Sequence, residues 1–195
     1  MPRKLVMASP RSGREIDNLA LRIITNFQPG VLRKLSAFDV ERFFECDLED
    51  LVEVETDYKE LPPGIHGYTD SETKECVVSL DLIEDPSQSF YSRSTMGHEV
   101  GHAYIHVPEF QMKKSFLRSV HDTDHVSLRL YREVDIPLYR NPEWQAWRFA
   151  GALLMPEPMV RMAVGKGFSV ENMSELFRVN PAFVRTRLKA LKINP

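Results

Sequence analysis

Cysteine is scarce in this chain of 195 residues, which contains only Cys46 and Cys76. Two cysteines cannot form a disulfide framework, and neither has a second cysteine at metal-ligand spacing. Long apolar runs are lacking too, because none approaches the roughly 18 residues needed to cross a bilayer. The basic N-terminus also lacks the apolar stretch that follows in a secretory signal peptide. We therefore expect a cytoplasmic protein that has no membrane as its partner.

Internal repeats and low-complexity segments are also missing, and the composition is that of an ordinary globular protein, 43% hydrophobic and 27% charged. The net charge of −3 conceals an asymmetry, because residues 159–195 carry seven Arg or Lys against two Glu. We therefore expect a main domain at 1–158, including N-terminal helices. Residues 159–195 are expected to form a basic helical unit packed on the same domain.

Hydrophobic spacing and capping residues predict several helices. We expect a helix from Ser92 or Ser94 to about Val107, ended by Pro108. Asp39 is suited to cap a helix at 40–46, and Asn141 to cap one at 142–154. Further helices are expected at 14–27, 169–178 and 181–191.

Strand patterns lie between these helices, so we predict an α+β fold. Alternating residues at 51–56, together with 65–69 and 75–80 around a polar turn, indicate a small antiparallel sheet. Segment 109–138 is ambiguous, and its residues 126–131 fit either a strand or part of a helix.

The segment His98-Glu-Val-Gly-His102 has HExxH spacing inside an expected helix. Residues four apart share one helix face, about 6 Å apart along the axis, so both imidazoles can bind one ion at roughly 2.0–2.1 Å. Glu99 is rotated away from this face, towards a water on the metal. Zinc lowers the pKa of such a water to about 7, and a carboxylate can accept its proton. We predict His98 and His102 as Zn²⁺ ligands and Glu99 as the catalytic base.

The alternative is a chance match between structural histidines on a helix. Gly97 and Gly101 argue against it, because glycine is costly inside a helix and indicates close packing beside the histidines.

A third ligand is needed to complete such a site. The metzincin pattern HExxHxxGxxH is excluded, because Ile105 and Pro108 occupy its last two positions. His106 extends the row, but it lies about 12 Å from His98 along a straight helix. We therefore expect His106 to lie beside the ligands or in the core.

Glu143 is the preferred third ligand. Glu109 follows Pro108 too closely, Glu133 lies in the ambiguous segment, and Glu157 sits between prolines. Glu143 opens a helix rich in small residues, which allow close approach to a neighbouring helix. The alternative is that Glu143 only stabilises the positive N-terminal end of its helix.

Two sequence blocks share their pattern with a known family. The first is His98-Glu-Val-Gly-His-Ala-Tyr-Ile-His106, and the second is Glu143-x-x-Ala146-x-x-Phe149-Ala150-x-x-Leu153-Leu154-Met155-Pro156. Together they resemble the ImmA/IrrE family of bacterial and phage metallopeptidases. The resemblance covers about residues 60–190. It implies that Glu143 is the third ligand and that His106 matches the family's extra histidine.

The resemblance also implies a fold and a partner. The family fold is similar to a minimal thermolysin-like zincin, with a small sheet before the active-site helix and often a helix-turn-helix-like unit after it. Characterised relatives cleave a repressor of the helix-turn-helix class. This chain departs from the family at Trp147, where Asn is common, in the loosely matching segment 94–97, and in an insertion at 107–140.

Residues 169–188 have the pattern of a helix-turn-helix. Its basic side chains are suited to contact phosphates: Arg178, Arg185, Arg187, Lys189 and Lys192. The second helix lacks an obvious set of Asn or Gln for reading bases. We therefore favour a helical packing unit with a solvated basic face over DNA binding.

A histidine-rich stretch at 121–125 has residue types that bind metal, although a solvated loop is the favoured interpretation. Several side chains are candidates to stabilise an oxyanion, and the sequence does not choose among them: His121, His125, Tyr104, Tyr131 and Tyr139.

The leading hypothesis is a zinc-dependent endopeptidase that cleaves a specific protein, a helix-turn-helix repressor, held by pairing with the strand at 75–80. The alternatives are a DNA-binding regulator with a structural or sensory zinc site and a toxin–antitoxin component. Glu99 favours the enzyme, because a structural zinc site is closed by four ligands and needs no carboxylate beside them.

Overall fold

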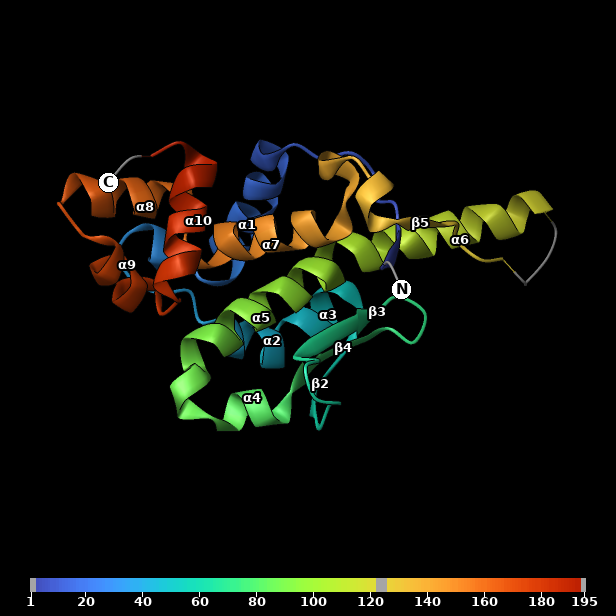
Figure 1. Ribbon diagram of the computed structural model, residues 1–195, viewed down its shortest axis with the longest axis horizontal. Coiled ribbons are helices and arrows are strands. Elements are labelled where there is room, and N and C mark those ends of the chain that lie inside the picture. The colour runs from blue at the N-terminus through green and yellow to red at the C-terminus, as the bar shows by residue number, and fades with distance from the viewer. Residues whose placement is uncertain (1–2, 122–125, 194–195) are drawn as a thin grey trace.

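The computed structural model describes residues 3–121 and 126–193 (Figure 1). It combines many helices with small sheets, so the predicted α+β class is confirmed. Within the described ranges, no helix is both long enough and apolar enough to span a membrane.

Helix α7 (Pro142–Leu154) packs against both α1 (Gly13–Phe27) and α5 (Ser89–Gly101), and it lies between them in Figure 1. Apolar side chains of these helices and of α2 (Val40–Cys46) form one hydrophobic core, which contains Ile16, Phe43, Val100, Phe149 and Leu153. This packing fixes α5 and α7 side by side.

Side-chain caps define where the predicted helices begin. Ser12 forms a capping box with Glu15 at the start of α1, and Asp39 accepts a backbone hydrogen bond at the start of α2. Asn141 caps α7 by accepting from the N–H of Glu143 at 2.8 Å. The helices predicted at 14–27, 40–46 and 142–154 are therefore confirmed.

A three-stranded sheet packs on α5 in the order β2 (Glu55–Lys59), β4 (Glu75–Ser79), β3 (Gly67–Asp70). The hairpin of β3 and β4 is antiparallel, as predicted, but β2 and β4 are parallel. The sheet is therefore mixed, because loop 60–66 carries the chain to the other side of β4. The strand predicted at 51–56 is wrong in its first half, where helix α3 (Leu48–Val52) forms instead. Helix α4 (Leu80–Glu84) follows β4.

Helix α5 continues without a break through a π-helical turn (His102–His106) into α6 (Val107–His121). The predicted helix end at Pro108 is therefore wrong. In the π-turn the N–H of Val107 donates to the carbonyl of His102, one residue further back than in an α-helix. This shift changes the hydrogen-bond register just before Pro108, whose ring and missing N–H would otherwise break the helix.

A second, two-stranded sheet pairs β1 (Lys4–Val6) with β5 (Leu130–Arg132), with Leu5 opposite Tyr131. The ambiguous segment 109–138 thus divides into the long helix α6 and a short strand. Neither strand has a clear alternation signal, because each is only three residues long. The pairing brings the N-terminal segment near the start of α7, while α6 projects beyond it (Figure 1).

The C-terminal part consists of α8 (Glu157–Gly165), α9 (Val170–Phe177) and α10 (Pro181–Leu191). Helices α9 and α10 confirm the two predicted helices. Helix α8 was not predicted, although its Pro158 is acceptable because proline suits the first turn of a helix. Side chains of this part, including Phe177 and Leu188, belong to the same hydrophobic core as α1 and α7.

Candidate metal centre

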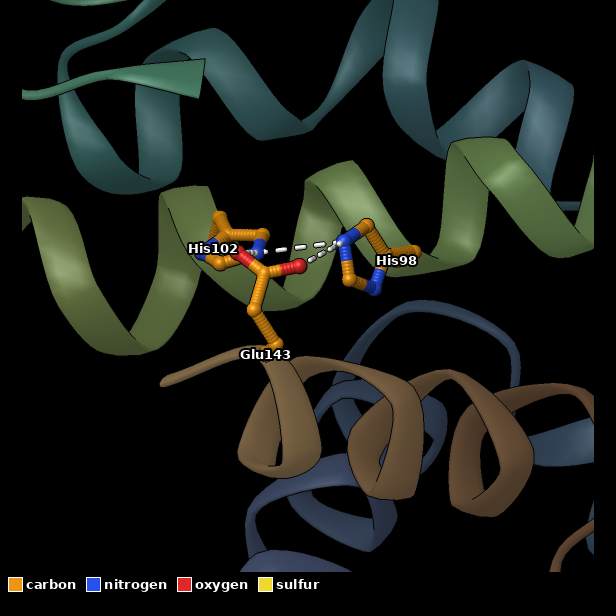
Figure 2. A group of neighbouring side chains, drawn as sticks. All are labelled: His98, His102 and Glu143. Carbon is orange, nitrogen blue, oxygen red and sulfur yellow. Dashed lines mark hydrogen bonds and ion pairs between the residues drawn. The ribbon is translucent and has the colours of Figure 1, made fainter. Parts of the chain in front are cut away.

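His98, His102 and Glu143 converge on one point between α5 and α7 (Figure 2). The Nε2 atoms of His98 and His102 lie 3.1 Å apart. The carboxylate of Glu143 reaches both rings, with Oε2 at 3.5 Å from Nε2 of His98 and Oε1 at 3.5 Å from Nε2 of His102. The structure thus brings together the three residues that the sequence proposed as metal ligands.

These separations suit a single tetrahedral zinc ion. Ligand atoms about 2.0–2.1 Å from a tetrahedral ion lie roughly 3.3 Å from one another. The distances between the donor atoms here are 3.1 and 3.5 Å. Two imidazoles and one carboxylate also form a ligand set that catalytic zinc sites use, with the fourth position left to water or substrate. The donor set therefore fits zinc, and it also suits other first-row divalent ions.

Small residues allow α5 and α7 to approach closely enough for this convergence. A Cβ at Gly101 would lie 3.1 Å from the backbone of Ala146, and one at Gly97 would lie 3.3 Å from the Cβ of Ala150. Both distances are shorter than ordinary carbon contacts. The glycines that flank the HExxH residues are therefore explained by helix packing.

A chain of hydrogen bonds determines which ring nitrogen of His102 carries its proton. Gln145 donates from Nε2 to the carbonyls of Ser9 and Tyr139, both at 2.9 Å, so its Oε1 faces His106. Nε2 of His106 must then carry the proton that it shares with this oxygen at 3.2 Å. Nδ1 of His106 is left to accept from Nδ1–H of His102 at 3.1 Å. The Nε2 lone pair of His102 consequently points towards His98 and Glu143.

The ring of His98 is held by packing. Its Nδ1 is buried without a hydrogen-bond partner among the described residues. The indole of Trp147 lies against the ring, with centroids 4.2 Å apart and planes tilted by 31°. Trp147, which the sequence marked only as a departure from the family pattern, therefore positions a candidate ligand.

Glu99 lies beside the three candidate ligands and is oriented by β3. Its Oε2 accepts a 2.7 Å hydrogen bond from the hydroxyl of Thr69. A Cβ at Gly67 would lie 2.9 Å from Cγ of Glu99 and 3.0 Å from the carbonyl oxygen of Val77, so only glycine leaves room there. The roles of Thr69 and Gly67 depend on contacts between residues distant in sequence, so no local pattern could have predicted them.

Burial is the main influence on the pKa values of these groups. It raises the pKa of Glu99, which suits a base that must take up a proton near neutral pH. It lowers the pKa of His102 well below the usual value, and that of His106 to about 4, so both rings are neutral at pH 7. Burial would raise the pKa of Glu143, but interactions with His98 and Arg3 outweigh it and lower the pKa.

The candidate centre opens into a cavity of about 240 Å³ that adjoins a groove of about 560 Å³. Arg3 lines both spaces, and its Nη2 lies 2.9 Å from Oε1 of Glu143. The cavity is therefore bounded by a carboxylate base on one side and a guanidinium on another. Arg3 was not proposed from the sequence, because strand β1, which begins at the next residue and brings Arg3 to the site, could not be predicted.

The other glutamates considered as ligands lie elsewhere. Glu109 is buried and bonded to Arg11 and Lys113, and these hydrogen bonds overcome its burial and lower its pKa to about 2. Glu157 pairs with Arg161 on α8. Glu133 lies in the short turn after β5.

Among the described residues, the three tyrosines proposed as oxyanion donors are not brought to the site. Tyr104 packs against Phe149, and neither Tyr131 nor Tyr139 lines the cavity or the groove in the part of the chain that the structure describes. The side chain of His121 and residues 122–125, including His125, lie outside the described residues. The possible second metal site at 121–125 therefore lies outside them as well.

The basic residues of α9 and α10 do not form one surface. Arg187 is buried, where its Nη1 lies 2.9 Å from Oδ1 of Asp17 and its Nε donates to the carbonyl of Met155. Arg185 is exposed and pairs with Glu171 at 3.4 Å. One of the predicted phosphate contacts is thus a structural ion pair.

Comparison with known proteins supports the fold alone. No protein-family model matches the chain, and no curated protein has significant sequence similarity to it. Among solved structures, the chain is similar to a Mycobacterium tuberculosis transcriptional regulator, with a TM-score of 0.53 and 19% sequence identity. The match covers 90% of this chain and 46% of that chain, so this chain spans less than half the length of the regulator. At this level of identity, the likeness shows a shared fold.

Proposed function

We propose that this protein is a zinc-dependent endopeptidase that cleaves a specific intracellular protein, a repressor of the helix-turn-helix class. One observation carries the proposal: His98, His102 and Glu143 converge with zinc-like spacing, and Glu99 lies in the same cavity. The resemblance of the two sequence blocks to the ImmA/IrrE family supports the same function. This resemblance is also the reason for proposing a repressor as the substrate.

The residues around the cavity divide the chemistry between them. A bound zinc ion supplies Lewis acidity, which activates water and polarises a peptide carbonyl. Glu99 accepts the proton of the attacking water and returns it to the departing amine. Thr69 holds the Glu99 carboxylate in place. We assign to Arg3, which lines the cavity and pairs with Glu143, the stabilisation of negative charge on the carbonyl oxygen, the role first sought among tyrosines and histidines.

Strand β3 is the better candidate to hold an extended substrate. Strand β4, at residues 75–79, has partners on both sides, so the strand first proposed for pairing has no free edge. In the described parts of the chain, the outer edge of β3 is unpaired, and its Gly67, Tyr68 and Thr69 line the cavity. A peptide added at this edge would pass the metal centre.

A regulator with a structural or sensory metal site is the second candidate. The similar solved structure is described as a transcriptional regulator, and Arg178, Lys189 and Lys192 are exposed on the C-terminal helices. Glu99 separates the two functions, because a sensory site does not need a carboxylate base beside its ligands.

Proteolysis of two substrates tests the proposal. Zinc-loaded protein would be incubated with casein and with a candidate helix-turn-helix repressor from the same organism, and the products mapped by mass spectrometry. We expect one or a few cuts in the repressor and little cleavage of casein, because pairing at β3 must be combined with recognition elsewhere. Cleavage of casein at many sites, with the repressor no better, would refute the substrate. Absence of cleavage in both would favour the regulator.

A further inference from the structure

An apolar pocket of about 310 Å³ lies between α7 and α10, outside the cavity of the metal centre. The rings of Trp144, Trp147 and Phe183 line it. The wall at Gly151 is not tightly packed, because a Cβ there would make only ordinary contacts, the nearest at 3.5 Å from Cδ of Arg187. This volume is near the lower end of the range for small-molecule sites, roughly 300–1,000 Å³, and it is large enough for one bulky side chain.

The charged ends of the pocket's two arginines are both engaged by one carboxylate. Arg148 and Arg187 both turn their guanidinium groups to Asp17, at 2.5 and 2.9 Å. Arg148 also donates to the carbonyl of Ala190. Their methylene stems are left to form the walls. The pocket therefore suits a neutral apolar group rather than an anion.

Trp147 joins this pocket to the metal centre. One face of its indole lies against the ring of His98, and Phe183 meets the indole nearly at right angles, with centroids 6.0 Å apart. Trp147 is 39% exposed, so part of the ring borders solvent between the two spaces. An extended chain advances about 3.3 Å per residue. A residue one or two positions from a bond held at the metal centre can therefore reach past this ring.

We propose that the pocket binds a large apolar side chain of the polypeptide substrate, aromatic or long aliphatic, one or two residues from the cleaved bond. The inference rests on the proposed function, because it takes the metal centre as the point of reaction. It predicts that cleavage sites have Phe, Trp, Leu or Met at one fixed position beside the cut.

Hydroxamate probes separate the pocket from the metal centre. Acetohydroxamate carries only the metal-binding head, whereas the series from phenylacetohydroxamate to 5-phenylpentanohydroxamate adds a phenyl ring on tethers of increasing length. Binding to zinc-loaded protein would be measured by calorimetry. We expect at least one phenyl probe to bind about tenfold or more tightly than acetohydroxamate, because its ring leaves water.

Variants on α10 locate that gain. Ala190→Phe fills the pocket from an exposed position, and Phe183→Ala removes one aromatic wall and serves if the first variant folds poorly. Both should reduce the phenyl gain to about twofold or less while acetohydroxamate binds as before. Lys189→Phe is the matched control, because it adds the same ring at an exposed neighbouring position that does not line the pocket.

The possible outcomes distinguish a failure of the pocket assignment from a failure of the metal centre. If acetohydroxamate binds but no phenyl probe gains, or the gain survives in both Ala190→Phe and Phe183→Ala, the pocket assignment is wrong and the metal centre stands. If neither zinc nor acetohydroxamate binds the unaltered protein, the proposed function fails and the assignment fails with it. N-phenethylacetamide is the last probe. Binding of this amide without zinc, as tight as that of the best hydroxamate, would identify a separate apolar ligand site and overturn the assignment.

Discussion

At the scale of single residues, the metal centre depends on where each proton lies. Gln145 is fixed by two backbone carbonyls, and it therefore orders His106, which in turn orders His102. The effect of His106 on a metal ion is indirect, through the ring of His102. Glu143 acts directly, because its two oxygens face the two imidazoles.

Replacing Glu143 and His106 by alanine should separate these roles. Glu143→Ala removes a ligand and should weaken zinc binding by more than about 100-fold. His106→Ala removes a partner of a ligand and should cost about 10- to 100-fold, so most of the metal stays bound in excess zinc. Competition with a chromophoric chelator measures both, with exposed His66→Ala as control. The opposite ranking would transfer the third-ligand role to His106.

The sequence predicted the residues whose spacing is local. His98, Glu99 and His102 share one helix, and Glu143 follows from the start of another. Arg3 and Thr69 could not be predicted, because each acts through one contact with a residue at least 30 positions away. Folding alone brings such pairs together.

At the scale of elements, the site depends on the distance between α5 and α7. The sequence predicted both helices, and it also predicted close packing from Gly97 and Gly101. It did not predict that α5 continues past Pro108, because the π-turn that permits this has no simple composition signal. It also missed the parallel pairing of β2 with β4, which depends on how loop 60–66 crosses the sheet.

Gly101→Ala should force α5 and α7 apart. The added Cβ would lie 3.1 Å from backbone atoms of Ala146, which cannot rotate away as a side chain can. We expect the free energy of unfolding to fall by about 1–3 kcal/mol, with weaker zinc binding as Glu143 moves from the histidines. Urea denaturation measures the first effect. Gly165→Ala is the control, because a Cβ there meets nothing within 4 Å and should be neutral or slightly stabilising. Equal effects would contradict the packing argument.

At the scale of the whole molecule, one half-buried carboxylate links three distant parts of the chain. Asp17 of α1 pairs with Arg148 of α7 and Arg187 of α10. The side chain of Arg187 is only 2% exposed, so its charge depends on this partner. Together with the continuous core, this cluster ties the C-terminal helices to the helices that carry the metal centre.

Asp17→Ala should therefore destabilise the whole protein. It leaves a buried guanidinium without its partner, which costs about 3–5 kcal/mol. Glu171→Ala breaks the exposed pair with Arg185 and should change stability by less than about 0.5 kcal/mol. Urea unfolding followed by tryptophan fluorescence and by circular dichroism measures both. We expect a single shared transition, whereas separate transitions would show that residues 159–195 unfold independently.

The most direct measurement of the central claim compares the unaltered protein with Glu99→Gln in two assays on the same samples. Zinc content is measured by mass spectrometry of the metal, and hydrolysis of the repressor by quantifying its fragments. The account predicts equal zinc in both proteins and a loss of hydrolysis of about 10²–10⁴-fold in Glu99→Gln, because an amide cannot accept the proton of water. Loss of zinc in Glu99→Gln, or hydrolysis that continues unchanged, would contradict the assignment of Glu99 as the base.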